Sequence, residues 1–411
     1  MVHARVGPLP RPIHTSVLEL ASETNEPLRI ALVITELETG GAENCLTELA
    51  IFLAARGCEV RVLALGPLPP PPRDELKKRL EAAGVDVRFG QARGVAQLGK
   101  VLHWLRRELR DFAPDLVQSM LWHANVTASL ALRGQPVKLV GGLRVSEPRR
   151  WRWPIERLCS GRMSMLVCVS EDVRRHAQDH ERLPGEKLVI IPNGISQDAL
   201  GPYAAPNWSE LGVAAPEHVL LFVGRLEPQK GALQLAEHLP EMLACLPAWQ
   251  AVIVGSGGQQ HRMRAVIKRS GLTEKVHFAG WQPRPARWML ASDLLLHPAA
   301  YEGMPNVLLE AMAVGKPFVA FAVDGVRQLL ADDYPEDLAN TQLADPRDWS
   351  EFNRCVRRLA NDAGLRRACG EANRHHVLAH FRLEDQLAKY EALYRALIQQ
   401  PAVELSSHRV D

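Results

Sequence analysis

Disulfide patterning is missing from the sequence: none of its seven cysteines forms a C-x-x-C pair, and their number is odd. A scattered, odd set is typical of reduced thiols in a cytoplasmic protein rather than of a disulfide framework. Long apolar runs are missing as well, since no stretch approaches the ~18 residues that a membrane-spanning helix needs. Residues 1–27 carry prolines and charges without a long apolar segment, which predicts an irregular leader rather than a signal peptide.

Excess charge of either sign is also absent. The formal net charge is +2 over 411 residues, so the composition gives no reason to expect a nucleic-acid partner, and any basic feature must be local. Hydrophobic residues make up 46% and charged residues 23% of the chain, which is the range of soluble globular proteins. A chain of this length exceeds one ordinary core, and two domains of ~150–200 residues are expected.

From residue 28 onward, short apolar runs alternate with turn-rich loops and amphipathic stretches. This alternation predicts a doubly wound parallel sheet; it stops in a loop-like segment and then starts again. We therefore expect an α/β protein with two Rossmann-like domains facing each other across a cleft, with ligand-binding loops at the carboxyl ends of the strands. A final amphipathic helix could pack on either domain. The expected segments are an N-terminal domain (28–194), a linker (195–217), a C-terminal domain (218–382) and a C-terminal helix with its tail (383–411).

In the stretch YEGMPNVLLEAMAVGK, Glu302 precedes a predicted helix that begins at Pro305, and Glu310 lies inside that helix. Pro305 suits the first helical turn, where free backbone N–H groups form an anion site. At ~1.5 Å rise per residue the two glutamates are up to ~12 Å apart, which disfavours an acid/base pair acting on one bond. Two carboxylates flanking an anion site suit a nucleotide sugar. From the spacing alone, a helix cap and an ordinary helical glutamate explain the pattern equally well.

Other loops after predicted strands carry candidate ligand-binding residues. VGRLEPQKG supplies Arg225 and Lys230, a cation pair able to hold a diphosphate, although solvated loop charges are a common alternative. In ETGGAE, Gly41 permits close backbone approach to a ligand, or only a turn. His123 in SMLWHAN is a cleft candidate, with a structural histidine as the alternative. The loop GSGG (255–258) lacks the full dinucleotide-binding spacing.

Taken together, these motifs resemble the retaining GT-B glycosyltransferases of family 4. YEGMPNVLLEAMAVGKP resembles the E-x7-E signature region of that family, and VGRLEPQKG, GGAE, VIIPNGI and VHFAGW match its other landmarks in the expected order. The resemblance covers about residues 28–400. It implies a GT-B fold whose last helix returns to the N-terminal domain. It also implies a hexosyltransferase-type enzyme with a UDP- or GDP-sugar donor and a saccharide or lipid-linked acceptor.

The resemblance further implies residue roles. Glu310 would bind the ribose hydroxyls of the donor, and Glu302 would lie near the hydroxyls of the donor sugar. Arg225 and Lys230 would neutralise the leaving diphosphate without a metal cofactor, in agreement with the absence of a D-x-D motif. His123 would lie near the reacting sugar. Backbone contacts to phosphate, sugar and base would come from Gly41, Phe278, Ala279, Gly280, Gly303, Met304, Pro305, Asn306 and Val307.

One loop departs from the family pattern. Where the family often has two glycines and then a glutamate, this sequence has Asp324, Gly325 and Gln328, which leaves the donor contacts of that loop open. The resemblance implies no enzymic nucleophile. It favours a front-face route in which preorganised cations and helix N–H groups stabilise the leaving phosphate, and that phosphate helps to deprotonate the acceptor. Domain closure would exclude water.

The segment RVSEPRRWRWPIERLCSGR (144–162) is locally basic. It has six arginines against two glutamates, a net charge of 6 − 2 = +4, with interleaved tryptophans. Arginine with tryptophan suits an anionic membrane surface or a lipid-phosphate acceptor. A solvated loop with packed tryptophans is the alternative. We hypothesise peripheral attachment to the inner membrane face of the cell, and the candidate residues are Arg149, Arg150, Trp151, Arg152 and Trp153.

Two rival functions remain open on the sequence. A nucleotide-sugar epimerase can share the two-domain architecture and would isomerise its substrate without an acceptor. A non-catalytic sugar-nucleotide binding protein is disfavoured because the predicted donor-binding residues are all present. The sequence leaves the donor base, the sugar and the acceptor open.

Overall fold

The computed structural model of the chain describes residues 27–195, 201, 206, 208–211, 216–331 and 333–399. Of the predicted leader only Pro27 is described, and most of the predicted linker lies outside the described residues, so both stay predictions. Among the described residues, no helix has the length and hydropathy to span a bilayer.

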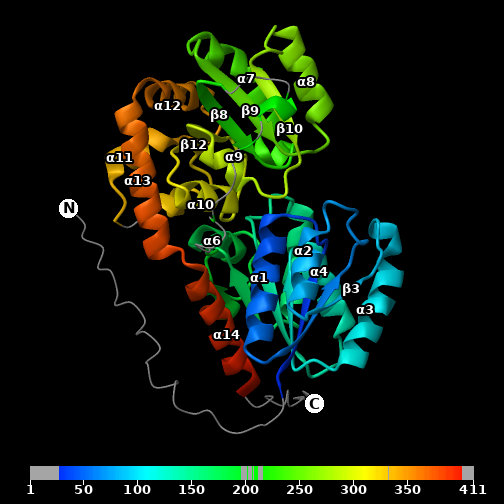
Figure 1. Ribbon diagram of the computed structural model, residues 1–411. Coiled ribbons are helices and arrows are strands. Elements are labelled where there is room, and N and C mark those ends of the chain that lie inside the picture. The colour runs from blue at the N-terminus through cyan, green and yellow to red at the C-terminus, as the bar shows by residue number, and fades with distance from the viewer. Residues whose placement is uncertain are drawn as a thin grey trace, which may run out of the picture.

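Two sheets, each flanked by helices, make up the described chain (Figure 1). The first has the strand order β3-β2-β1-β4-β5-β6-β7 and the second the order β10-β9-β8-β11-β12-β13, with parallel pairing throughout. This arrangement confirms the predicted α/β fold with two Rossmann-like domains. The strands of the first sheet are β1 (Arg29–Ile34), β2 (Glu59–Ala64), β3 (Asp86–Phe89), β4 (Leu116–Met120), β5 (Lys138–Leu143), β6 (Met165–Cys168) and β7 (Leu188–Ile190). Those of the second are β8 (His218–Val223), β9 (Trp249–Val254), β10 (Val276–Gly280), β11 (Leu294–His297), β12 (Phe318–Phe321) and β13 (Leu343–Ala344).

Helices connect successive strands and cover the sheets (Figure 1). The first domain contains α1 (Gly41–Ala55), α2 (Glu75–Ala82), α3 (Leu98–Phe112), α4 (Trp122–Ala131), α5 (Trp153–Ser160) and α6 (Glu171–Asp179). The second contains α7 (Ala232–Ala244), α8 (Gln260–Arg269), α9 (Ala286–Leu290), α10 (Asn306–Ala313), α11 (Glu336–Gln342), α12 (Trp349–Asn361) and α13 (Ala363–His380), and α14 (Leu383–Gln399) ends the described chain.

Strand β1 shows how the core is divided. Ala31 and Val33 belong to one hydrophobic cluster and Ile30, Leu32 and Ile34 to another, because successive side chains of a strand point to opposite faces of the sheet. A parallel sheet covered on both faces needs apolar residues on both, which explains the continuous apolar runs in the sequence. The cluster that holds Ala31 continues into the second domain.

Helix α14 covers the first sheet although it follows the second domain in the sequence (Figure 1). Tyr390 and Tyr394 are each 1% exposed and lie in the hydrophobic cluster of Ile30 and Leu32. The Tyr394 hydroxyl donates a 2.9 Å hydrogen bond to the Gln118 side-chain oxygen on β4. The first domain is therefore completed by the last helix of the described chain.

The chain passes between the domains on two adjacent segments. The backbone N–H of Ile195 donates to the carbonyl of Phe381 at 2.8 Å, and the N–H of Leu383 donates to the carbonyl of Ile195 at 3.2 Å. A Cβ atom on Gly194 would lie 2.5 Å from the carbonyl oxygen of Arg382, so only glycine fits between the two segments. These contacts fix the geometry of the crossing.

Candidate active site

Strand-order reversals bring residues of both domains to one region. The order reverses between β1 and β4 in the first sheet and between β8 and β11 in the second, and ligands of open α/β sheets bind at such switch points. Gly41 and His123 follow β1 and β4, whereas Arg225 and Glu302 follow β8 and β11. The two loop sets meet, because the Asn306 side-chain amide donates a 3.1 Å hydrogen bond to the Gly41 carbonyl.

Glu302 lies in a buried cluster of charge. It is 4% exposed, accepts a hydrogen bond from the Lys230 ammonium, and lies with its Oε1 atom 3.2 Å from His297 Nε2. Burial acts to raise the pKa of Glu302, but the charge of Lys230 and the His297 contact outweigh it and lower the pKa to about 2. Burial lowers the pKa of His297, which favours its neutral form. Glu302 is therefore an anion held by one cation.

Local backbone geometry positions Lys230. It ends a short 3-10 helix, Pro228–Lys230, and is followed by Gly231 in the left-handed region at φ 66°. A Cβ atom on Gly231 would lie 2.0 Å from the Pro298 carbonyl oxygen, so the turn requires glycine. Arg225 lies in the same loop, is exposed, donates to the Gln229 side-chain oxygen at 3.2 Å, and makes no ion pair within the described residues. The loop thus presents one paired and one unpaired cation.

Glu310 lines a cavity between the domains of about 630 Å³. Burial raises its pKa to about 7, and its carboxylate accepts no hydrogen bond from the part of the chain that the structure describes. The cavity wall includes Asn44 and Cys45 of α1, Arg284, and Gln386 of α14. A carboxylate without a partner at the wall of a cavity is suited to accept hydrogen bonds from a ligand.

The loop that precedes α10 is held by the N-terminal domain. Asn193, which is 3% exposed, donates its side-chain amide to the Met304 carbonyl at 3.0 Å and to the Asn306 side-chain oxygen at 2.7 Å. A Cβ atom on Gly303 would lie 2.1 Å from the Arg144 carbonyl oxygen. Pro305 is the N-cap of α10, and Val307 follows in its first turn. Sequence reasoning did not assign Asn193, although it lies in the quoted VIIPNGI motif.

The segment predicted to border the nucleobase of the donor, Phe278 to Gly280, forms the end of β10. Phe278 is partly buried beneath the Arg264 guanidinium, 4.3 Å from the ring centre, and Ala279 follows it. Gly280 has φ 68°, and its carbonyl accepts a 2.7 Å hydrogen bond from the Gly255 N–H. The first glycine of the GSGG loop is therefore attached to this strand end.

The loop that departs from the family pattern contacts the other domain. Ser146 donates to the Asp324 carboxylate at 2.8 Å, and the Gly325 N–H donates to the Asp172 carboxylate at 2.9 Å. The Glu171 N–H donates to the Gln328 side-chain oxygen at 3.0 Å. In this structure these residues join the domains to each other.

Sequence reasoning gave Glu43 no role. It lies in the first turn of α1, two residues after Gly41, and burial raises its pKa to about 7 against the opposing charge of Arg225. Its carboxylate covers the Gly40 backbone, since a Cβ atom on Gly40 would lie 2.3 Å from Glu43 Oε2. The sequence signal that could have identified it is the glutamate of the GGAE motif, which is Glu43 itself.

His123 lies in the first turn of α4, beside an aromatic and basic group. The Trp122 ring lies 5.1 Å from the His123 ring and 5.5 Å from the Trp151 ring, both edge-on. The Arg152 guanidinium lies 4.5 Å from the Trp122 ring centre. Burial, followed by the charges of Arg152 and Arg149, lowers the pKa of His123. The predicted reacting-side histidine and the basic segment therefore lie together, although they are distant in the sequence.

Within the basic segment, the side chains divide into held and exposed ones. Arg152 pairs with the Glu147 carboxylate at 2.8 Å, and the Trp153 indole N–H donates to the Glu147 carbonyl at 2.8 Å. Arg149 and Arg150 are exposed, and Trp151 is 60% exposed. Only part of the predicted acceptor or membrane set is therefore available to a partner.

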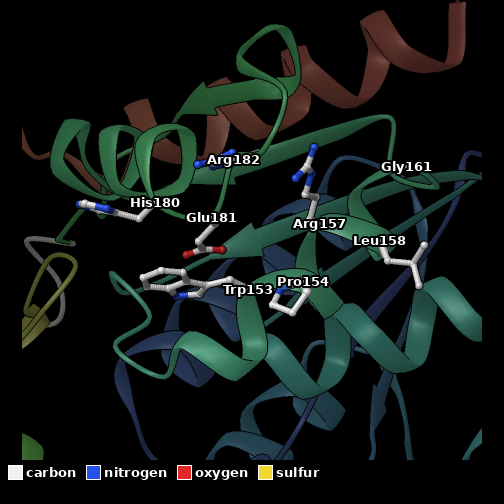
Figure 2. Close-up of a pocket in the computed structure, with 8 residues that line it drawn as sticks. All are labelled: Trp153, Pro154, Arg157, Leu158, Gly161, His180, Glu181 and Arg182. Atoms are coloured by element: carbon white, nitrogen blue, oxygen red, sulfur yellow. The ribbon is translucent and has the colours of Figure 1, made fainter.

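A surface hollow of about 610 Å³ lies beside this segment (Figure 2). Residues of α5 and of the turn after α6 line it, with Trp153 stacked on His180 at 6.0 Å between ring centres. Glu181 is 5% exposed, and burial raises its pKa to about 8. Leu158 at its margin is 81% exposed.

Comparisons with known protein families match both halves of the chain. The family described as "Glycosyl transferases group 1" matches residues 209–376, and the family described as "Glycosyltransferase Family 4" matches residues 39–199.

Relatives and solved structures agree with these matches. The lipopolysaccharide glucosyltransferase WaaG of Escherichia coli is 29% identical over 53% of this chain and 58% of its own length. The phosphatidyl-myo-inositol mannosyltransferase of Mycobacterium leprae is 29% identical over 71% of this chain and 78% of its own length. The structure of Anabaena HepE in complex with UDP-glucose superposes with a TM-score of 0.76 at 21% identity, over 90% of this chain and 100% of that one. At that identity the likeness shows a shared fold.

Proposed function

Since the chain belongs to the glycosyltransferases of group 1 and family 4, we propose that it moves a sugar from a nucleoside-diphosphate sugar to a saccharide or lipid-linked acceptor with retention of configuration. The setting we propose is the synthesis of a cell-surface polysaccharide or glycolipid. Relatives named for lipopolysaccharide and phosphatidylinositol glycosylation support this setting.

One observation carries the donor assignment: the Glu310 carboxylate lines the interdomain cavity without a hydrogen-bond partner among the described residues. Two adjacent ribose hydroxyls would supply two donors to this acceptor. HepE was solved with UDP and with UDP-glucose, which supports a uridine donor as the first candidate and a guanosine donor as the second.

Leaving-group stabilisation is the main chemical task in this proposal. Charge develops on the β-phosphate as its bond to the sugar carbon breaks, and Arg225 and Lys230 would neutralise it. In the structure Lys230 already balances Glu302, so a bound diphosphate would share that ammonium. Glu302, kept ionised by its low pKa, would accept from the donor sugar hydroxyls.

Retention would follow from a front-face route. The acceptor oxygen forms its bond to the sugar carbon on the face from which the phosphate departs, and the acceptor proton passes to a phosphate oxygen. Gly41 and the backbone from Gly303 to Val307 would hold the phosphates and the sugar, and His123 would lie on the acceptor side. We propose that the step needs no metal, because the loop cations take that role; turnover that persists in a chelator would support this.

Substitution of two donor-site residues tests the assignment. Glu310→Ala and Lys230→Ala should each reduce kcat/KM by about tenfold or more, because a hydrogen bond to a charged group contributes about 1.5–3 kcal/mol. The matched controls are Glu274→Ala and Lys268→Ala, which alter exposed residues of the same domain. Near-wild-type kinetics in both Glu310→Ala and Lys230→Ala would refute the proposal.

Product analysis separates the rival functions. A transferase releases nucleoside diphosphate only as the acceptor is glycosylated, and nuclear magnetic resonance of the product reports the retained anomer. Isomerisation of the donor without an acceptor would identify an epimerase. Saturable donor binding with no turnover over a panel of saccharide and lipid-linked acceptors would favour a binding protein.

For the acceptor side, we propose a cytoplasmic protein that attaches peripherally to an anionic membrane surface. Support comes from the exposed side chains Arg149, Arg150, Trp151, Arg157 and Leu158, which combine positive charge with apolar surface (Figure 2 shows the last two). Each such arginine is worth about 1 kcal/mol near an anionic surface.

Liposome co-sedimentation tests the attachment. Arg149→Ala with Arg150→Ala should reduce binding to phosphatidylserine vesicles by about tenfold or more. Arg269→Ala with Arg262→Ala removes the same charge from exposed positions on α8 and should leave binding unchanged. Equal sedimentation of the two double variants would contradict a specific surface.

A further inference from the structure

Three possible metal ligands converge at the carboxyl end of α13, in a group unrelated to the proposed transfer. His376 and His380 are four residues apart and therefore share one face of the helix. Asp333 precedes α11, and its Oδ1 atom lies 3.2 Å from His376 Nδ1 and 3.1 Å from His380 Nε2. All three ligand atoms lie within 4.8 Å of one another, and no other such group of three occurs in the described part of the chain.

The two aspartate–histidine separations suit one shared ion. Bonds from zinc to imidazole nitrogen and carboxylate oxygen are ~2.0–2.2 Å long, so two ligand atoms at a tetrahedral ion lie ~3.4 Å apart. The aspartate–histidine separations of 3.1 and 3.2 Å are close to that edge length. Two imidazoles with one carboxylate form a ligand set that suits zinc and neighbouring transition metals.

A buried network holds the two ligand-bearing segments together. The hydroxyl of Tyr334, the residue after Asp333, donates 2.7 Å to the Asn373 side-chain oxygen, one turn before His376 on α13. Asn373 is fully buried and donates 2.9 Å to the Lys316 carbonyl. The Tyr334 ring also packs edge-on against the His376 ring at 5.4 Å. Asp333 is thereby placed against α13 by contacts that need no ion, as expected of a preorganised site.

One side of the group is open to solvent. The Asp333 side chain is 66% exposed and that of His380 38%, whereas that of His376 is 5% exposed. An ion could enter from this side and keep water as its remaining ligand. None of the three residues lines the interdomain cavity, so the group is separate from the candidate donor site.

We propose that Asp333, His376 and His380 bind one divalent transition-metal ion, such as Zn²⁺, which ties the last turn of α13 to the segment before α11. Helix α13 also supports α10, since the Arg374 guanidinium donates 3.3 Å to the Ala313 carbonyl at the end of the Glu310 helix. The chain crosses to the first domain directly after His380. The ion would therefore stabilise the element that both supports α10 and leads into the crossing.

Zinc titration of untagged protein tests this site. After removal of metals with a chelator and buffer exchange, calorimetry should show one Zn²⁺ per chain at micromolar affinity or tighter, on the order of that of a three-ligand site. Thermal unfolding should shift upward with Zn²⁺, because an ion that binds the folded state stabilises it. Asp333→Asn and His380→Gln should each weaken binding by about tenfold or more and remove the shift.

His375→Gln is the matched control, because it removes an exposed histidine from the same helix and leaves the group intact. It should bind Zn²⁺ as the wild type does. The proposal is overturned if the wild type binds no ion at one per chain, if either ligand variant binds as the wild type, or if His375→Gln loses the ion. Both altered ligands are partly exposed, so without metal the thermal unfolding temperature of each variant should equal that of the wild type. The same measurement verifies that the variants are folded.

Discussion

At the scale of residues, the two glutamates of the E-x7-E stretch lie in opposite electrostatic surroundings. Lys230 and His297 hold the pKa of Glu302 at about 2, whereas burial raises the pKa of Glu310, which has no hydrogen-bond partner among the described residues, to about 7. The first carboxylate is charged before any ligand arrives. The second gains most when a ligand supplies hydrogen-bond donors.

The raised pKa of Glu310 predicts a pH-dependent donor affinity. Because the ionised form accepts hydrogen bonds from both ribose hydroxyls, affinity for a nucleoside-diphosphate sugar should fall as the pH drops below about 7. Glu310→Gln should bind more weakly at pH 8 and lack this part of the pH dependence. Calorimetry between pH 6 and 8 measures both, and identical profiles would contradict the assignment.

In the absence of donor, the free energy of unfolding should show the opposite pH dependence and fall as the pH rises. The folded pKa of about 7 lies above the ordinary value of 4.5, so the folded state holds the proton more strongly. The free energy of unfolding contributed by Glu310 is therefore highest below pH 4.5, falls as the pH rises to about 7, and is constant above it.

At the scale of elements, glycine allows the loop before α10 to lie against the first domain. Gly303 has room for no side chain, since the Arg144 carbonyl oxygen would lie 2.1 Å from a Cβ atom there. Rotation of a side chain cannot relieve this contact, because the atom that a Cβ would meet belongs to the backbone of Arg144. The loop and the segment that directly follows β5 must therefore separate to accept even a methyl group.

Gly303→Ala should separate these two elements. We expect a loss of kcat/KM of tenfold or more, because a displacement of ~1 Å in a positioned site has consequences of about 10²-fold. Gly99→Ala on α3 is the control, since a Cβ atom there meets nothing within 4 Å. Unchanged kinetics in Gly303→Ala would show that the contact does not position the site.

Elements with strong local patterns could be predicted from the sequence. The helix expected at 383–399 is α14, and the one expected from Pro305 is α10 with Pro305 as its N-cap. The sequence predicted neither β3 (Asp86–Phe89) nor β13 (Leu343–Ala344), because runs of four and two residues carry little periodicity. In the site, Glu302 and Lys230 could be singled out by their motifs. Asn193, which donates to the Met304 carbonyl of the other domain, could not be singled out in this way, because that contact depends on how the two domains meet and no local pattern encodes it. His297, the partner of Glu302, lies five residues before it at the end of β11, but the sequence does not show that its ring faces the carboxylate.

At the scale of the whole molecule, side chains connect the two domains across the candidate site. Arg73, in the loop before α2, donates 2.9 Å to the Glu38 carboxylate of its own domain and 3.0 Å to the Ser256 hydroxyl of the other. Its guanidinium also lies 5.7 Å from the Trp281 ring centre. A single arginine thus contacts the GSGG loop and the residue after β10.

Loss of this arginine should favour an open arrangement of the domains. Arg73→Ala should increase the radius of gyration measured by small-angle scattering without donor and raise the KM for donor severalfold. Arg88→Ala on β3 serves as the control, because among the described residues that side chain pairs with Asp86 of its own domain. A scattering curve like that of the wild type would show that other contacts hold the closure.

The return of α14 to the first sheet sets an order of events on the ribosome. Leu383 follows the end of β7 by 383 − 190 = 193 residues, so at ~5–20 residues per second the first domain waits about 10–40 s for its last helix. The second sheet is fully synthesised during that interval. Nascent chains that end before residue 383 therefore lack Tyr390 and Tyr394 and expose the part of the first sheet's hydrophobic cluster, beside Gln118 of β4, that these residues later cover. That surface is where a chaperone would act.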